Sequence, residues 1–194
     1  MSQRHVTTTE DDPLLDAAYD SVMAVGVRRT TLTDVARRAG VSRMTVYRRF
    51  GDVAALIQAL MTREFSTVLT DAVAAHRALP TVRERLTRGA ADGVVALSGH
   101  PLFLRLLDVD PELFLPYLVQ RHGAFQHLVL DAFAALLEEG MDEGSIRRTD
   151  PRGLAVALEL CLRGWVIAAR ADDPDGLRER ATTELHPLLE GALR

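Results

Sequence analysis

The sequence has a single cysteine, Cys161, no lysine, and no apolar run long enough to cross a membrane. One cysteine excludes an internal disulfide, and without a signal peptide or a spanning segment the chain is expected to be soluble and cytoplasmic, with no membrane partner. Free cysteine is most often buried, and Cys161 lies in an apolar helical pattern, so we expect a core position rather than a redox sensor. All 23 basic residues are arginine, and no function follows from that alone.

Signatures of catalysis and of metal binding are also missing. The chain contains no glycine-rich phosphate-binding loop, no G-x-S-x-G nucleophile motif and no H-E-x-x-H pair. His122 and His127 are five residues apart, which does not place them on one face of a helix, and no cluster of cysteines or carboxylates completes a metal site. We therefore expect no enzymatic activity, no metal and no cofactor.

The most informative stretch is residues 31–50, which read TLTDVARRAGVSRMTVYRRF. Thr31 is a candidate N-cap with Asp34 three residues on, as in a capping box, and Ser42 can cap a second helix. Gly40 permits a left-handed turn between the two helices. Two short helices joined by a tight turn with glycine are typical of a helix-turn-helix, in which the second helix enters the major groove of DNA.

Charge is distributed unevenly along the chain. Residues 26–50 contain seven arginines and one acid, Asp34, a net charge of +6, which leaves −10 for the rest of a chain whose total is −4. A basic block in an acidic protein is the pattern of a local phosphate-binding surface, although an ordinary solvated face has the same composition.

Apart from residues 1–11, which are polar and without period and are expected to form a disordered arm, the pattern is helical throughout. Caps, prolines and glycines divide it and predict, besides the two short helices, helices at 12–25, 53–79, 81–97, 102–107, 111–139, 151–170 and 175–193. Gly140 and Gly144 are expected to bracket a turn. The sequence therefore predicts an all-α fold.

Residues 30–36 (TTLTDVA), 39–42 (AGVS) and 45–47 (TVY), with Phe50 and Leu56, resemble the N-terminal domain of the tetracycline-repressor (TetR) family of transcriptional regulators. The resemblance implies an N-terminal three-helix DNA-binding domain with the helix-turn-helix at 12–51, followed by a larger helical effector-binding and dimerisation domain at 52–194. It further implies a ligand-responsive repressor that binds a palindromic double-stranded DNA operator as a dimer. The alternatives are a helical protein-interaction module that keeps a helix-turn-helix as scaffold, or an enzyme.

Carried over by position, the resemblance implies a set of DNA-binding residues. It comprises phosphate contacts from Tyr47 and Arg49, a cap and backbone role for Thr31, and base reading by Thr33, Arg43, Met44, Thr45 and Arg48. Arg37 joins the predicted set because the helical pattern leaves it outward. Arg43 reaches a base or a phosphate equally well from the start of a recognition helix. Two positions depart from the family pattern: Met44 replaces a usually small residue, and Val53 replaces a lysine that would anchor phosphate.

In the family the middle helices enclose the effector cavity. Candidates here by residue type, for an unidentified small-molecule effector, are Phe103, Phe114, Tyr117, Arg121, His122, Phe125 and Trp165. Aromatic residues at helical spacing are also ordinary core residues, and that alternative stands for each of them.

The resemblance also implies a homodimer through the last two helices. The helix at 151–170 is apolar on nearly every side and must be covered all round, in part by the last helix. The predicted interface comprises Leu154, Leu158, Leu162, Leu177, Ala181, Leu185 and Leu188. Glu159 and Arg163, four residues apart, form either an internal pair or polar groups in a cavity, and the pair is favoured because a buried charge needs a partner.

Overall fold

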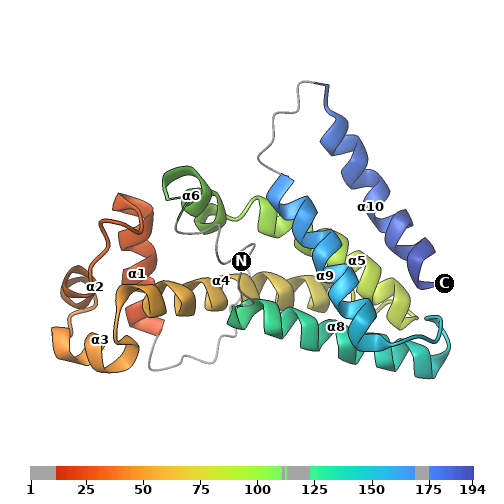
Figure 1. The fold of residues 1–194 in the computed structure, drawn as a ribbon, viewed down its shortest axis with the longest axis horizontal. Coiled ribbons are helices and arrows are strands. Elements are labelled where there is room, and N and C mark those ends of the chain that lie inside the picture. The colour runs from red at the N-terminus through yellow and green to blue at the C-terminus, as the bar shows by residue number, and fades with distance from the viewer. Residues whose placement is uncertain (1–11, 111, 113–122, 169–174) are drawn as a thin grey trace.

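The computed structural model describes residues 12–110, 112, 123–168 and 175–194. These residues contain helices and no β-strand (Figure 1), as the sequence predicts. The helices are α1 (Asp12–Val25), α2 (Leu32–Arg38), α3 (Arg43–Phe50), α4 (Val53–Ala75), α5 (Val82–Ser98), α6 (Pro101–Val109), α8 (Ala124–Glu143), α9 (Pro151–Ala168) and α10 (Leu177–Leu193). None of them is long and apolar enough to cross a membrane.

The first three helices form a small unit whose local structure follows the predicted caps. The Thr31 side chain accepts a hydrogen bond from the backbone N–H of Asp34 at the start of α2 (3.1 Å), and the Ser42 side chain accepts one from the N–H of Thr45 at the start of α3 (3.1 Å). Gly40, between the helices, has φ 69°, the left-handed conformation that glycine adopts without cost. The helix-turn-helix is therefore present as predicted.

The long helix α4 connects this three-helix unit to the rest of the protein (Figure 1). Its N-cap is Asp52, whose carboxylate accepts from the N–H of Ala55 (2.8 Å). The first turns pack on α1 and α3 through the fully buried Leu56 and Leu60, and later turns pack on α5 and α8. One continuous core thus spans the three-helix unit and the helical body, by which we mean α4 to α10.

Within the helical body, α5 is central and packs against α4, α8, α9 and α10. The last helix lies mainly on α5, where Glu190 accepts hydrogen bonds from Arg83 (3.0 Å) and from the hydroxyl of Thr87 (3.1 Å). The last helix was expected to cover part of the apolar helix before it, but α9 is not among the helices on which α10 mainly packs. One face of α9 stays exposed as a result.

The predicted helix at 111–139 also differs from the structure. Gly123 has extended backbone angles (φ −75°, ψ 175°) and is the N-cap of α8, which then continues past the predicted end to Glu143. Gly140 lies inside the helix, and only Gly144, with φ 81°, ends it. A Cβ at Gly140 would come within 2.5 Å of Ile146, so this glycine permits a close side-chain contact and not a turn.

Helix α6 attaches the helical body to the turn between α1 and α2. Arg105 donates hydrogen bonds to the carbonyl oxygens of Val22 and Ala24 in the last turn of α1 (3.4 Å each), and the Val22 oxygen also accepts from the backbone N–H of Gly26 (2.9 Å). The carboxylate of Asp110, only 2% exposed, accepts from the backbone N–H of Val27 (2.6 Å) and lies 3.5 Å from the guanidinium of Arg28. These contacts fix the three-helix unit to α6.

Replacing Gly26 or Gly40 by alanine should distinguish backbone strain from steric conflict at this junction. Both have positive φ, so each substitution should cost about 1–2 kcal/mol of stability from strain alone. At Gly40 the added Cβ meets nothing within 4 Å, whereas at Gly26 it would lie 2.8 Å from the side chain of Val109. Gly26→Ala should therefore lower the free energy of unfolding in urea more than Gly40→Ala, and equal losses would contradict this account of the junction.

Candidate nucleic-acid interface and ligand cavity

Helix α3 is held by one face and leaves the other to solvent. Val46 is fully buried, and Phe50 packs against the core beside it. The opposite face presents two arginines, Arg43 and Arg48, with Met44 (68% exposed) and Tyr47 (54% exposed) among them. Large apolar side chains interleaved with arginines suit base edges and phosphates at once.

The nine predicted DNA-binding residues lie together on α2, α3 and the cap of α2. Eight of them are exposed, and only Thr45 is half-buried, with its hydroxyl 2.8 Å from that of Ser42. Thr31 is used as a cap through its side chain, and Thr33 is exposed in the first turn of α2. The structure therefore brings the set onto one compact unit, while contact with DNA stays a prediction.

Asp34 organises the charges of α2. Its carboxylate accepts hydrogen bonds from Ser21 (3.2 Å), Arg38 (2.7 Å) and Arg37, so it does not return to the N-cap, and the predicted capping box is only half formed. The hydrogen bonds from Arg38 and Arg37 lower the pKa of Asp34 to about 2. Arg37, predicted to face DNA, is 72% exposed but is held by this carboxylate.

The basic block is consequently narrower than the sequence suggests. Of its seven arginines, Arg37 and Arg38 pair with Asp34, and Arg28 pairs with Asp110 and Glu112 on the side of the helical body. Three of the other four arginines belong to α3. Because one carboxylate faces two arginines on α2, that helix keeps a net charge of +1, whereas the candidate recognition helix carries three arginines and no acid.

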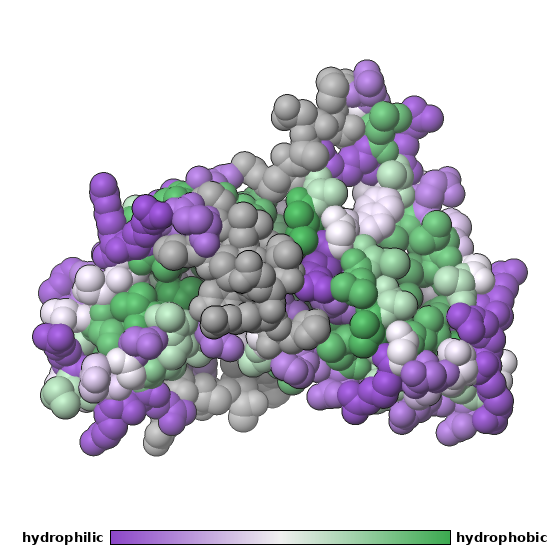
Figure 2. All heavy atoms as spheres, viewed as in Figure 1, coloured by the Kyte–Doolittle hydropathy of each residue, from purple (hydrophilic) through white to green (hydrophobic). Residues whose placement is uncertain are grey.

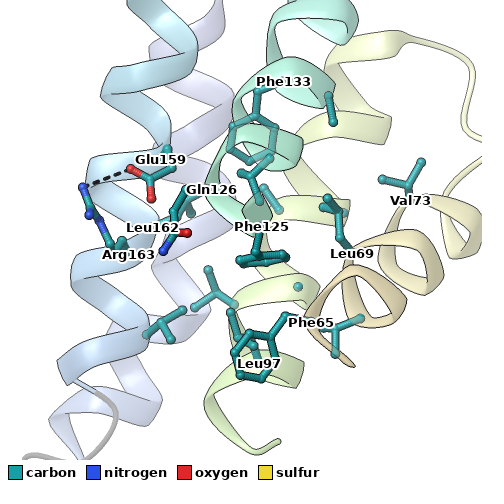
Figure 3. Close-up of a pocket in the computed structure, with 18 of the residues that line it drawn as sticks. Phe65, Leu69, Val73, Leu97, Phe125, Gln126, Phe133, Glu159, Leu162 and Arg163 are labelled. Atoms are coloured by element: carbon teal, nitrogen blue, oxygen red, sulfur yellow. Dashed lines mark ion pairs between the residues drawn. The ribbon is translucent and has the colours of Figure 1, made fainter. Parts of the chain in front are cut away.

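The helical body contains a cavity of about 190 Å³ between α4, α5, α8 and α9, with one side chain from α6 (Figure 3). Its wall is mostly apolar. Phe65 of α4 meets Phe103 of α6 and Phe125 of α8 edge to face, with ring centroids 6.2 and 5.7 Å apart. Leu69, Val73, Leu97, Phe133 and Leu162 are among the other lining residues.

A buried ion pair from α9 forms the polar part of the wall. Arg163 and Glu159 lie 3.2 Å apart, with side chains only 16% and 8% exposed, and Gln126 lies close by (Figure 3). The predicted internal pair is therefore confirmed. The pair also lines the cavity, so both interpretations of these residues, as an internal pair and as polar groups in a cavity, apply.

The structure divides the predicted ligand-binding residues into three groups. Phe103 and Phe125 line the cavity, whereas Trp165 does not and instead faces a separate surface hollow next to α10. The remaining candidates, Phe114, Tyr117, Arg121 and His122, lie outside the described residues. Sequence reasoning missed the contribution of α4, although its apolar residues at 61, 65, 68, 69 and 73 continue one helical face.

The predicted dimer residues also fall into groups. Leu158, Leu162 and Leu185 are 7%, 6% and 1% exposed, so they belong to the chain's own core and leave no surface for a partner, which corrects their assignment. Leu154 and Ala181 are half-buried. Leu177 and Leu188 are 56% and 63% exposed. A helix that is apolar all round does not reveal from sequence which face its own core takes.

Beyond Arg152 in its first turn, the face of α9 that remains exposed carries no charge. Figure 2 shows hydrophobic residues gathered over α9 on the viewed face. The α9 stripe, as we call the exposed residues at helical spacing, comprises Gly153, Val156, Ala157, Leu160, Cys161, Gly164, Ile167 and Ala168. Cys161 is thus exposed and not in the core, contrary to the expectation from its apolar surroundings.

Comparison with known proteins gives consistent matches. Residues 14–60 match the model of bacterial regulatory proteins of the tetR family. The chain is 33% identical over 185 residues to an uncharacterised helix-turn-helix transcriptional regulator of Mycobacterium bovis, which covers 93% of this chain and 92% of that one.

Solved structures share the fold, including these two. One is the TetR family repressor AlkX from Dietzia, implicated in n-alkane biodegradation (TM-score 0.65, 21% identity, 100% of both chains). The other is the regulator FadR from Bacillus subtilis in complex with stearoyl-CoA (TM-score 0.59, 16% identity, 94% of this chain and 98% of that one).

Asp34→Asn should destabilise the protein near neutral pH, by an amount that shrinks in acid. An unfolded aspartate titrates at about 3.9, whereas in the fold the pKa of Asp34 is lowered to about 2. The contribution of the charged form is therefore complete above about pH 4 and is lost as the pH falls through about 2. Urea unfolding of the wild type and of Asp34→Asn between about pH 2 and neutral pH measures this contribution to the free energy of unfolding. Asp71→Asn, at an exposed site on α4, is the control, and a deficit independent of pH would refute the role of the ionised carboxylate.

Proposed function

The chain belongs to the TetR family of bacterial transcriptional regulators, and from that premise we propose that it is a ligand-responsive repressor that binds a palindromic operator as a homodimer. Its relatives regulate transcription, and the chain is a regulator and not an enzyme. The observation that carries the proposal is the exposed face of α3, where arginines, a tyrosine and a methionine surround a helix anchored by the buried Val46.

In the proposed complex, α3 lies in the major groove. Arg43 and Arg48 match the paired acceptors of guanine or a phosphate, the side chain of Met44 suits the methyl group of thymine, and the hydroxyl of Tyr47 suits a phosphate. Because Asp34 already offsets one of the two arginine charges of α2, affinity depends mostly on α3. Two such helices in one dimer would engage two half-sites of a palindrome.

We propose that the α9 stripe is the centre of the dimer interface. The stripe extends over 16 residues, from Gly153 to Ala168, which is about 24 Å of helix. An uncharged apolar face of that length is costly to leave in water and resembles an interface core. Leu177 and Leu188, exposed on α10, extend the candidate surface.

The proposed switch uses helices that touch both the cavity and the three-helix unit. Helix α6 carries Phe103 in the cavity wall and Asp110 at its far end against the α1–α2 turn. Helix α4 lines the cavity through Phe65 and packs on α1 and α3 with its first turns. A ligand that binds one arrangement of these helices better than another would change the placement of α3 and so release the operator.

The effector would be a small and mostly apolar molecule. A cavity of about 190 Å³ lies below the roughly 300–1,000 Å³ of pockets for drug-sized ligands. A whole acyl-CoA of the kind bound by FadR would exceed it. Its aromatic wall favours a compact hydrocarbon group.

Arg43→Ala tests the recognition surface. If Arg43 reads guanine, the variant should lose about 1–3 kcal/mol on the cognate site and little elsewhere. If it contacts phosphate, all sequences should weaken alike, and the salt dependence should fall by about one unit of slope. Fluorescence anisotropy with DNA that flanks the coding region, at several salt concentrations, separates the two. Arg88→Ala, at an exposed site on α5, is the control. Failure of a confirmed dimer to bind any palindrome at low salt would refute operator binding.

Leu160→Glu tests the dimer interface, because it places a charge in the middle of the α9 stripe. The variant should be monomeric at micromolar concentration in light scattering, and its single thiol, Cys161, should react with maleimide faster than in the wild-type dimer. Leu128→Glu, which changes an equally exposed leucine on α8 outside the stripe, should remain dimeric with a slow thiol. The interface proposal fails if both variants behave as the wild type.

A further inference from the structure

Among the described residues that line the cavity, the charged groups compensate one another. Glu159 and Arg163 form a pair 3.2 Å apart in the wall, and both side chains are nearly buried. Together they carry no net charge. The cavity therefore contains hydrogen-bonding groups without an excess of either sign at this point.

The other two arginines in the wall do not change this balance. Arg85 lies 2.9 Å from Glu139 and 3.9 Å from Glu143, so its charge is matched from outside the cavity. Arg77 is exposed beyond the end of α4, where water and salt screen its charge. The Nε of Arg85 is buried without a hydrogen-bond partner among the described residues, so it can donate to a neutral ligand, while the charge of this arginine is already matched by Glu139 and Glu143.

A ligand that carried its own charge would upset this balance. A carboxylate beside Arg163 would also lie beside Glu159, and an ammonium group beside Glu159 would lie beside Arg163. Either ion would leave water for an apolar cavity without a counter-charge of its own, and an uncompensated buried charge costs several kcal/mol of binding. The geometry therefore disfavours acids and amines alike.

A hydroxyl group fits the same wall. Glu159 only accepts hydrogen bonds and Arg163 only donates them, whereas a hydroxyl does both. We infer that the effector is a small, electrically neutral molecule whose hydroxyl group contacts the Glu159–Arg163 pair and whose hydrocarbon part fills the aromatic side of the cavity. This inference rests on the proposed function in one respect, namely that the cavity is the ligand site.

The volume sets the size of this hydrocarbon part. An apolar cavity of about 150 Å³ holds one benzene molecule, and the cavity here measures about 190 Å³. One ring with one or two further carbon atoms, or a short chain of similar volume, is therefore the appropriate class. A para-ethylphenyl group meets this requirement and can carry a hydroxymethyl, a carboxylate or an aminomethyl head group.

The experiment compares para-ethylbenzyl alcohol, para-ethylbenzoate and para-ethylbenzylammonium on the full-length protein near neutral pH by isothermal titration calorimetry. The alcohol should bind at least about tenfold more tightly than either ion. The inference is overturned if the benzoate or the ammonium compound binds as tightly as the alcohol. It is overturned equally if none of the three binds up to its solubility limit.

Glu159→Gln provides the charge test. With the carboxylate neutralised, Arg163 should favour an anion, so the affinity for para-ethylbenzoate should rise at least about tenfold relative to the alcohol. Glu138→Gln removes the same charge at an exposed site on α8 and should leave the ratio unchanged. An unchanged ratio in a folded Glu159→Gln variant would overturn the inference. If circular dichroism finds that variant unfolded, the wild-type ranking decides alone.

Gly93→Leu locates the binding site. Gly93 lines the cavity, and a Cβ there would make an ordinary contact, 3.7 Å from the Cβ of Ala72, so a larger side chain can fill part of the space without backbone strain. Alcohol binding should be lost in this variant, and undiminished binding would place the ligand elsewhere and overturn the inference.

Binding is measured without DNA, so its outcome is independent of the switch. Operator binding is then followed by anisotropy with and without the alcohol. Tight alcohol binding with no effect on DNA would support this inference and refute the ligand-responsive part of the proposed function. Release of the operator by the benzoate at lower concentrations than by the alcohol would overturn this inference and support the ligand-responsive part of the proposed function.

Discussion

A buried carboxylate, that of Asp110, holds the three-helix unit to the helical body. It accepts the backbone N–H of Val27 in the turn after α1, and it lies beside Arg28. A carboxylate 2% exposed is tolerated only with such partners, because an uncompensated buried charge costs several kcal/mol. The orientation of α3 relative to the cavity therefore depends in part on the C-cap residue of α6, a helix of nine residues that also carries Phe103 in the cavity wall.

The sequence predicted well wherever local chemistry decides the structure. Thr31, Gly40 and Ser42 set the caps and the turn of the helix-turn-helix through contacts within a few residues, and the structure has them as predicted. The ion pair of Glu159 and Arg163 follows from a spacing of four on one helix in the same way.

Prediction was weaker wherever distant segments decide. The Asp34 side chain does not complete the capping box, because its carboxylate accepts hydrogen bonds from partners that include Ser21 on another helix. Gly140 stays helical because Ile146 packs against it. Which side of α9 faces the core depends on α5 and α8, so the leucines at 158 and 162 were assigned to the wrong face. The cavity could not be derived for a related reason: its wall combines five helices, and of its described lining only Phe103 and Phe125, with Glu159 and Arg163 as one of two alternatives, were anticipated.

Helix α9 has two roles on opposite faces. One face carries Glu159, Leu162 and Val166 in the cavity wall, and the other carries the α9 stripe. In the proposed dimer this helix becomes a partition between a cavity and the neighbouring subunit. A displacement of α9 that makes room for a molecule on one side is transmitted to the two-fold axis on the other, so the two cavities would fill cooperatively, and the dose response of the regulator would be steeper than that of a single site.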